Sequence, residues 1–471
     1  MKRFLYLILI LAGMWLGGCA TNPADRPPPM PKSNIQNIPL KFGEGSTNAP
    51  SGAGWLKDFN DATLNALVGE AIRNNPDLRV TAAKLKIARA NLKIAGASLL
   101  PTLTAKAAAS RTKRNNTSGF SITSSRSERY TPSLDLAWEV DVWGRLADSR
   151  LAAQLDTEEA AANLQAARLS LAANTAKGWF SLAETELQAQ LSRQTLKSYT
   201  NNLAVLEEGL QAGLTKALDV RLMRTSVRNT EGTLQLRLRE RDTARRSLEV
   251  LLGRYPKSEV ALGAGLPTLT NAVPAGLPAQ LLERRPDVIA AQRSYFAAYH
   301  RVSSAKKDRL PKISLTGSYG TSSDELENVL DINNNVWNLA VNLTKPIFDA
   351  GKIKSQIERS KAQQEEARYQ YVQTALQAFA EVETALAAEG FLTAQETALR
   401  ASTTEAGEAQ TLALEDYQAG LTDIVTVLES QRRVFDAKRS LIQIQNLRLQ
   451  NRIDLYLALG GEFEQPKPNA E

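Results

Sequence analysis

The chain has 471 residues, of which 43% are hydrophobic, 6% aromatic and 23% charged, and its mean hydropathy is −0.29. This composition is typical of a soluble helical protein and excludes a bundle of membrane-spanning helices. The net charge of +7 arises from 57 basic and 50 acidic residues. Because the basic residues are mixed with acids instead of forming one tract, we expect no nucleic-acid partner.

The N-terminus, residues 1–18, reads as a secretory signal peptide: two basic residues precede the apolar run Phe4 to Trp15, which is too short to span a bilayer comfortably. Cys19 follows Leu-Gly-Gly and is the only cysteine, so no intrachain disulfide can form. The context resembles the bacterial lipobox, in which the cysteine is acylated after cleavage; the alternative is an ordinary signal with an incidental cysteine. Ala20 stands where an aspartate typically retains lipoproteins at the inner membrane, so the resemblance points to the outer membrane.

Residues 19–52 are rich in proline and lack hydrophobic periodicity, which predicts an extended tether between lipid and folded body. The first of two repeats is expected at residues 53–252. It opens with a predicted helix from about Ala62 to Leu99, broken near Pro76 because proline cannot donate a helical hydrogen bond.

The period then changes from helical to alternating, within residues of about 101–143. Apolar side chains alternate strongly with polar ones over residues 134–143 and more weakly over residues 103–109, which predicts two strands. The polar stretch Arg111 to Arg129 is expected to join them as a long loop. One face of each strand is apolar and the other polar.

After Gly144 the pattern is helical up to a turn at about residues 211–217, without an interior proline. A helix of about 65 residues is on the order of 100 Å long. Leucines recur every seven residues near its end, which predicts coiled-coil packing. Gly213 is expected to end the helix and Thr215 to cap the returning one. Residues 253–277, with several prolines and glycines, form a predicted irregular connector.

The second repeat, residues 278–462, follows the same plan. The sequence Gln-Ala-Gly-Leu-Thr occurs at Gln211 and again at Gln418, and the spacing from an upstream glycine to each copy is identical. Strands are expected at about residues 311–346 and a helical turn at about 418–424, where Gly420 and Thr422 match the first turn. Residues 463–471 form a polar tail. The chain is therefore a tandem duplication.

Four strands of about ten residues with a long polar loop in each pair indicate a transmembrane β-barrel, although a soluble half-buried sheet is the alternative for any one strand. Four strands cannot close a barrel, because unpaired edges are not tolerated in lipid. We therefore expect several chains to build one barrel.

The sequence predicts no enzyme. His300 is the only histidine, so we expect neither a multi-histidine metal site nor a Ser/His/Asp triad, and we expect His300 to pack or lie at the surface. No cofactor is expected apart from the covalent lipid on Cys19.

Several stretches of the chain, in a specific order, carry a resemblance to a known family: Leu16–Cys19, Trp55–Asp61, Trp138–Arg145, Leu281–Val288, Pro346–Gly351, both Ala-Gly-Leu-Thr turns and Leu459–Gly461. With these stretches the chain resembles the TolC-like outer-membrane efflux channels, in particular their lipid-anchored branch. This family implies a mainly α-helical trimer whose twelve-stranded β-barrel spans the outer membrane and continues as a periplasmic α-helical barrel. It also implies two partners, a periplasmic adaptor protein and an inner-membrane pump.

The resemblance further implies site residues at the periplasmic mouth. The turns would contact the adaptor through Gly213, Leu214, Thr215, Gly420, Leu421 and Thr422. Acidic residues just past the second turn would ring the closed aperture. The matching positions are Thr426, which departs from the family by not being acidic, and Glu429; Asp423 is a further candidate, or else an acid stabilised by its helix N-terminus.

The resemblance therefore implies a homotrimeric exit duct in the outer membrane, which passively passes small toxic compounds from the pump and adaptor to the outside. An exit duct for type I protein secretion is the alternative of the same architecture. A lipid-anchored coiled-coil scaffold without a pore is the alternative from another class, and it leaves the four amphipathic strands unexplained.

Overall fold

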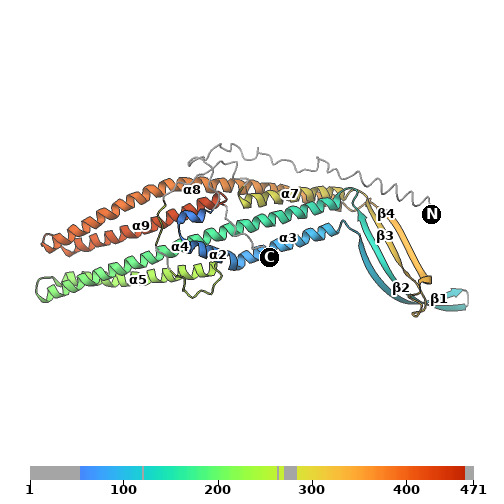
Figure 1. Cartoon of the computed structure of the whole chain (residues 1–471), viewed down its shortest axis with the longest axis horizontal. Helices are drawn as coiled ribbons and strands as arrows, with labels where there is room; N and C mark the ends of the chain where they lie inside the picture. Colours follow the sequence, from blue (N-terminus) through green and yellow to red (C-terminus); the bar gives the residue numbers. More distant parts are fainter. Residues whose placement is uncertain (1–53, 119–120, 262–264, 270–283, 462–471) are drawn as a thin grey trace. The chain divides into compact units, whose positions relative to one another are not determined.

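The computed structural model describes residues 54–118, 121–261, 265–269 and 284–461 (Figure 1). The predicted signal peptide, Cys19, the tether and the tail lie outside these residues. The described chain forms two compact units, and each contains part of both repeats. One unit holds the strands, with residues 98–152 and 296–365; the other is helical and is built from the described residues of 37–97, 153–295 and 366–471.

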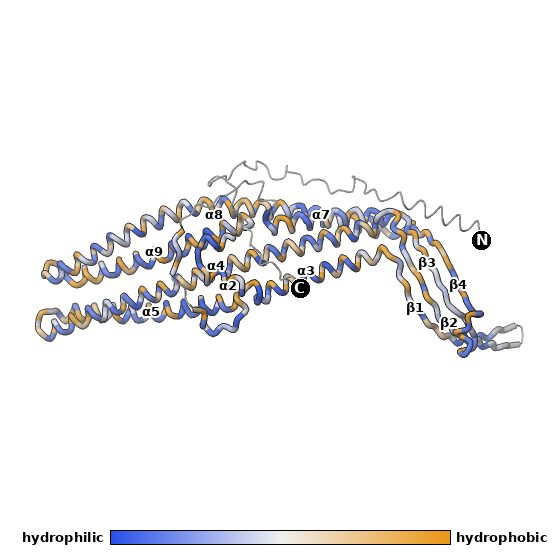
Figure 2. Tube along the Cα trace, viewed as in Figure 1, coloured by the Kyte–Doolittle hydropathy of each residue, from blue (hydrophilic) through white to orange (hydrophobic). Residues whose placement is uncertain are grey.

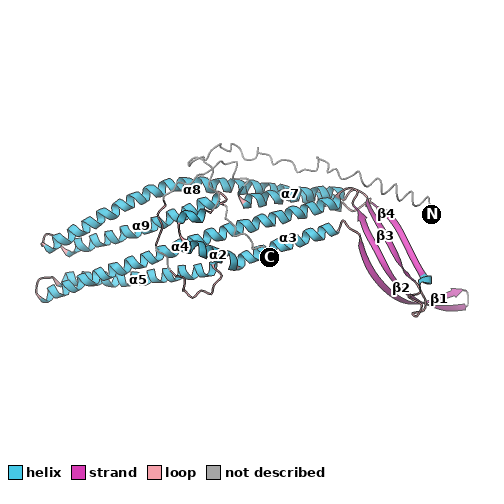
Figure 3. Ribbon diagram, in the orientation of Figure 1, coloured by secondary structure: helices cyan, strands magenta, loops and turns pink. Residues whose placement is uncertain are grey.

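The strand unit contains one antiparallel sheet in the order β1-β2-β3-β4 (Figure 3). The prediction of two strands per repeat is confirmed. The bounds are β1 Thr102–Ser118, β2 Ser121–Val140, β3 Lys312–Thr321 and β4 Asn335–Thr344.

The first hairpin corrects one prediction. β1 and β2 are 17 and 20 residues long, so most of the stretch Arg111 to Arg129 is strand and not loop. Arg111 pairs directly with Glu128 in the ladder, and their side chains form an ion pair with Nε and Oε1 2.9 Å apart. Polar residues occupy both faces there, which removes the alternation on which sequence-based strand prediction depends.

The helical unit contains most of the long helices. None of the helices in the described ranges is both long and apolar enough to cross a membrane. The break predicted near Pro76 is present, since Asn75 has an extended conformation between two helices. The bounds are η4 Trp55–Phe59, α2 Ala62–Asn74, α3 Pro76–Ala97, α4 Arg145–Gln211, α5 Ala217–Leu251, α7 Pro286–Lys307, α8 Lys352–Gln418 and α9 Ile424–Ala458; the ends of α4, α7 and α8 nearest the strands belong to the strand unit.

The core of the helical unit lies around Trp179 and Phe180 of α4, both almost completely buried. The ring of Phe180 lies 5.1 Å from that of Phe59, centroid to centroid. Asp61 joins this core to the start of α2: one of its carboxylate oxygens accepts a 2.7 Å hydrogen bond from Trp179 Nε1, and the other accepts the backbone N–H of Thr63. One side chain thereby caps a helix and satisfies a buried indole.

The connector between the repeats is held by Glu249 near the end of α5. Its buried carboxylate accepts the backbone N–H groups of Ser258 and Glu259 at 2.7 and 2.5 Å, and that of Val260 at 3.2 Å. Burial raises the pKa of Glu249, but these three hydrogen bonds outweigh it and the pKa lies below its ordinary value.

The predicted coiled-coil seam near the first turn is present in the helical unit. Tyr199 and Leu206 of α4 are buried with Met223 of α5 and with Val427 of α9. The heptad positions therefore pack against both returning helices and not only against the neighbour in sequence.

Candidate functional site: the strand faces and the helical turns

One face of the sheet is apolar and exposed, and hydrophobic residues recur along the trace of β4 (Figure 2). Leu103, Val341 and Leu343 have exposed fractions of 67%, 71% and 69%. The strand register places them on one face, because Leu103 lies opposite Leu136 on β2 and Leu343 opposite Ile313 on β3. This is the arrangement that a lipid-facing surface requires.

The opposite face is polar. Lys106 Nζ lies 2.7 Å from Asp135 Oδ2, and the side chain of Asn342 contacts the Thr316 hydroxyl at 3.5 Å. The faces predicted from the alternation are thus the faces that the register produces.

The outer edges of this sheet have free backbone groups. Among the described strands, β1 and β4 each pair on one side only. An unpaired edge in hydrocarbon leaves N–H and C=O groups without partners, at a cost of several kcal/mol for each group, on the order of the transfer penalty of a peptide group. The sheet therefore requires a further strand at each edge when it lies in a membrane.

The two helical turns have the same backbone geometry. Gly213 and Gly420 both have a φ of 74°, a left-handed conformation that glycine adopts readily. The N–H of Leu214 donates to Gly209 O, and the N–H of Leu421 donates to Asp416 O, each at 2.8 Å. The helix ends predicted from the sequence are confirmed.

Each turn presents one exposed leucine. The exposed fractions are 86% for Leu214 and 78% for Leu421. Single exposed apolar side chains are common on protein surfaces and do not identify a contact surface by themselves. Contact of these turns with an adaptor stays a prediction.

The expected caps are wrong by one residue. Thr215 and Thr422 do not cap the returning helices; the N-cap positions are Lys216, which makes no side-chain cap, and Asp423. The chain needs one more residue after the left-handed glycine before it can enter a helix in the reverse direction.

Asp423 caps α9. Its Oδ1 accepts hydrogen bonds from the backbone N–H of Thr426 at 3.0 Å and from the Thr426 hydroxyl at 3.1 Å. The Thr426 N–H is the largest cause that holds the pKa of Asp423 below its ordinary value, and the hydroxyl adds to it. Two of the three aperture candidates thus form one capping interaction, which supports the helix-start interpretation of Asp423.

This assignment predicts the behaviour of one amide. In Asp423→Ala the Thr426 N–H loses its acceptor, so we expect faster hydrogen exchange at that amide and at Val425. Thr422→Ala is the matched control and should leave both rates unchanged. Equal exchange rates in the two variants would contradict the capping role.

Glu429, the third aperture candidate, is paired with two arginines on its own helix. Its carboxylate accepts from Arg432 Nη2 at 2.8 Å and from Arg433 Nε at 3.0 Å. Arg432 is the larger cause and Arg433 the next, and together they lower the pKa of Glu429 to about 2. Glu429 is therefore ionised at neutral pH, but its charge is offset. The sequence analysis missed both arginines, although the spacings of three and four residues were a usable signal.

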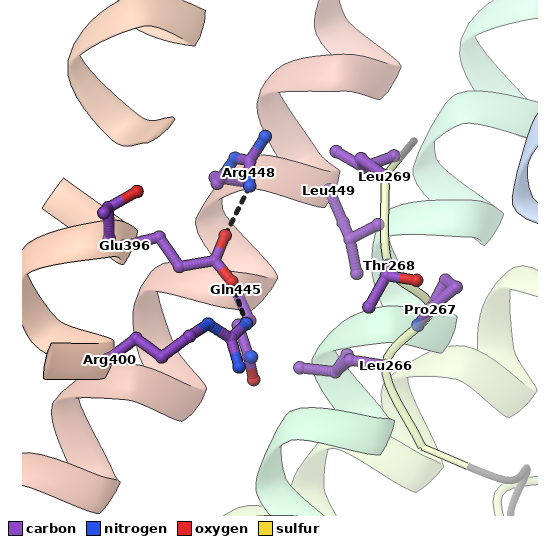
Figure 4. A pocket seen from close by; sticks show the side chains of 10 residues that line it. Leu266, Pro267, Thr268, Leu269, Glu396, Arg400, Gln445, Arg448 and Leu449 are labelled. Atoms are coloured by element: carbon purple, nitrogen blue, oxygen red, sulfur yellow. Dashed lines mark hydrogen bonds and ion pairs between the residues drawn. The ribbon is translucent and has the colours of Figure 1, made fainter. Parts of the chain in front are cut away.

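An open pocket of about 290 Å³ lies where α8, α9 and the connector meet (Figure 4). Glu396 of α8 lies between Arg448 and Arg400, and Arg400 Nη2 is 2.5 Å from Glu396 Oε1. Burial raises the pKa of Glu396, while the two guanidinium groups lower it more, so that the pKa is below its ordinary value. The carboxylate already has two cationic partners, and the cluster ties α8 to α9.

His300 is buried in a polar cluster of the strand unit. Packing inside the protein was one of the two placements expected for it from the sequence. Its Nδ1 lies 3.1 Å from Asp148 Oδ1, and Lys307 Nζ lies 2.7 Å from Asp148 Oδ2. The cluster joins the start of α4 to the end of α7. Within the described part of the chain, no three His, Cys, Asp or Glu side chains come together so that they could hold a metal ion.

Each of the two repeats contributes two strands to one amphipathic sheet and one long helical hairpin, an organisation that indicates a duct protein of the outer-membrane class. A sequence model of the outer membrane efflux protein family matches the chain twice, over residues 67–254 and 277–461. The chain belongs to the outer membrane efflux protein family. The resemblance to TolC-like efflux channels is thereby confirmed, and with it the outer-membrane location.

Two curated relatives and one solved structure illustrate the similarity. The chain is 30% identical to the cation efflux system protein CusC of Escherichia coli O6:H1 over 98% of its length and 99% of the relative. It is 31% identical to the solvent efflux pump outer membrane protein SrpC of Pseudomonas putida, over 96% and 97%. The Campylobacter jejuni CmeC outer membrane channel has a TM-score of 0.85 and 25% identity, over 91% of this chain and 92% of that one.

Proposed function

We propose that three copies of this chain form the exit duct of a tripartite efflux system, with a closed barrel of twelve strands in the outer membrane. The observation that carries the proposal is the pair of free edges on an amphipathic sheet of four strands. Four strands are too few to close a barrel in lipid, and the resemblance to TolC-like channels implies three copies, which would supply twelve strands. The long helices of each copy would continue the duct into the periplasm.

A periplasmic adaptor and an inner-membrane pump complete the proposed system. The exposed Leu214 and Leu421 at the two turns are the surface on which the adaptor would dock. The relatives are named for the efflux of cations and of solvents at nearly the same identity. Similarity to these relatives therefore does not identify the cargo, and we expect the pump that the duct serves to select it.

Passive conduction, without catalysis, is the remaining part of the proposal. Asp148, Glu396 and Glu429 are each paired with cationic side chains. These ion pairs tie helices together or lie along one helix, which supports a structural role for the three carboxylates. Efflux in place of protein secretion is supported by the names of CusC and SrpC, both of which describe efflux.

The test is reconstitution of the purified protein in planar bilayers, with its mass in detergent measured by light scattering. A trimer that gives discrete conductance steps supports the duct. A monomer, or a trimer that never conducts although it is inserted and is given its adaptor, would overturn it and favour a scaffold.

In the same bilayers Glu429 is expected to affect ion preference. Glu429→Gln removes the carboxylate that offsets Arg432 and Arg433, so the reversal potential in a KCl gradient should shift toward anions. Glu408→Gln makes the same change of charge on α8, about three helical turns before Gly420, and is expected to leave the potential unchanged. Equal shifts of the reversal potential in the two variants would contradict the placement of Glu429 at the mouth of the duct.

Acylation of Cys19 is part of the proposal. In cells given a labelled fatty acid, the unaltered protein should incorporate label and Cys19→Ser should incorporate none, because the chain has no other thiol. The barrel should hold the variant in the membrane without its lipid. Label on Cys19→Ser would exclude the lipobox assignment.

A further inference from the structure

We infer that β4 of one copy pairs with β1 of the next copy in a specific register, with Leu343 opposite Ala107 and Val341 opposite Ala109. The inference rests on the proposed trimer and goes further, because it states which residues meet at the seam between copies. The inference is argued from the duplication within the chain. The pairing of β2 with β3, where the two repeats meet, is used to derive the pairing of β4 with β1 of the next copy, which we call the seam between copies.

The repeat relates backbone pairing as well as sequence. Gly144 and Gly351 lie 207 residues apart, and Pro101 and Pro311 lie 210 apart. The residue 210 positions after Thr102 is Lys312, and the residue 207 positions after Ala137 is Thr344. Both pairs are observed as directly opposed residues, Thr102 with Ala137 and Lys312 with Thr344. The two hairpins therefore have the same register under the repeat.

The same spacings apply to the junction where the repeats meet, between β2 and β3. In this junction Val140 lies opposite Ile313, Leu136 opposite Gly317 and Leu134 opposite Tyr319. Each residue of β2 that pairs with β3 corresponds to the residue 207 positions later, in or just after β4. Each residue of β3 corresponds to the residue 210 positions earlier, in β1. The corresponding pairs across two copies are Ile347 with Leu103, Leu343 with Ala107 and Val341 with Ala109.

Exposure at the two seams agrees with this correspondence. Val140 and Ile313 are half-buried, because each has the other strand beside it. Their counterparts are Leu103 and Ile347, the latter three residues past the end of β4, and these have exposed fractions of 67% and 98%. The pair that is half-buried at the internal seam thus has equivalents whose apolar surface is left open at the chain's edges, where a second copy would cover it.

The faces of the sheet also match in this register. Leu343 and Val341 lie on the apolar face of β4, and Leu103 lies on the same face of β1. Ala107 and Ala109 are four and six residues after Leu103, so they lie on that face as well. A slip by one residue would bring the apolar face of one copy beside the polar face of the next. A slip by two would keep the faces matched, so the experiment must resolve two residues.

Paired cysteines provide that resolution. Directly opposed residues in an antiparallel pair have Cα atoms about 4.5 to 5.5 Å apart, within the range of a disulfide, whereas a slip by two gives about 7 to 8 Å. The test variant carries Leu343→Cys with Ala107→Cys. The slipped controls carry Leu343→Cys with Ala105→Cys and with Ala109→Cys. Leu343→Cys alone reports any reaction with Cys19.

Each variant is expressed in the outer membrane, oxidised and separated on a non-reducing denaturing gel, with native mass measured in parallel. We expect the test variant to give at least about fivefold more covalent dimer and trimer than either slipped control. Leu134→Cys with Tyr319→Cys should cross-link only within one chain, since these residues are opposed in the internal junction.

The outcomes separate the inference from the proposed function. Native trimers in which a slipped pair cross-links best, or in which no pair cross-links, overturn the register and leave the trimeric duct intact. Native monomers for the unaltered protein overturn both. Preferential cross-linking of residues 343 and 107 supports the inference.

Discussion

Val341→Arg is expected to reduce assembly of the duct strongly, and Asn342→Arg is not. Val341 lies on the apolar face of β4 with an exposed fraction of 71%, while Asn342 lies on the polar face. A guanidinium on the lipid face near the middle of the bilayer costs about 2 to 4 kcal/mol in each chain, whereas one in the lumen remains hydrated. Because a trimer contains three copies, the penalty occurs three times per barrel.

The comparison isolates the face of the strand, because the two positions are neighbours and receive the same residue. The measurement is the amount of heat-resistant trimer in outer-membrane fractions, together with the temperature at which it dissociates. Asn342→Arg loses only the weak 3.5 Å contact with Thr316. Equal loss of trimer in both variants would mean that the sheet does not face lipid.

Asp148→Asn is expected to destabilise the strand unit by about 3 kcal/mol at neutral pH, the cost of removing one partner from a buried ion pair. The change leaves Lys307 without its carboxylate partner and replaces the group that His300 contacts. Asp416→Asn, the same change at an exposed position on α8, is the control and should have little effect. Tm in detergent measures the difference.

The pH dependence of this effect has a definite sign. Burial raises the pKa of Asp148, but hydrogen bonds from His300, Lys307 and Ser303 lower it more, and the folded-state pKa lies below its ordinary value of 3.8. A carboxyl with a depressed pKa contributes stability that is fully present above its unfolded pKa and is lost as the pH falls through the folded value. The gap between the protein and Asp148→Asn should be constant above pH of about 5 and should shrink below about 4. A gap that widened on acidification would contradict the assignment.

The fold could be predicted from the sequence wherever one face of an element is apolar. Alternation at residues 134–143 predicted the last part of β2, which ends at Val140, and both of its faces; heptad spacing near the end of α4 predicted the seam where Tyr199 and Leu206 are buried. The duplication predicted the second hairpin because each element recurs at a fixed spacing. Periodicity reports burial, so it is reliable for elements that are buried on one side.

Where both faces of an element are polar, hydrophobic periodicity does not reveal the element. Arg111 and Glu128 lie in strands that extend beyond the apolar section of the hairpin, and their pairing depends on a partner strand and not on a periodic face. The caps were displaced to Lys216 and Asp423 because backbone geometry after a left-handed glycine, and not residue type, decides where a helix begins.

The aperture role of Glu429 follows only from the family resemblance and stays a prediction. The two arginine partners of Glu429 came only with the side-chain contacts. Cys19 lies outside the described residues, so its acylation stays a prediction. The adaptor contact of the turns needs a second protein, which no pattern within one chain can reveal.

The helix lengths carry an evolutionary consequence. α4 and α8 each have 67 residues, and α5 and α9 each have 35. A deletion of one heptad from α4 alone would shorten one arm of a hairpin by about 10 Å. The buried residues of α4 would then no longer lie beside the residues of α5 that they pack against. A duct for a wider or narrower periplasm could therefore arise only through matched changes in all four helices, in units of whole heptads. Among relatives of different length, insertions and deletions in these helices should be inherited as such matched sets.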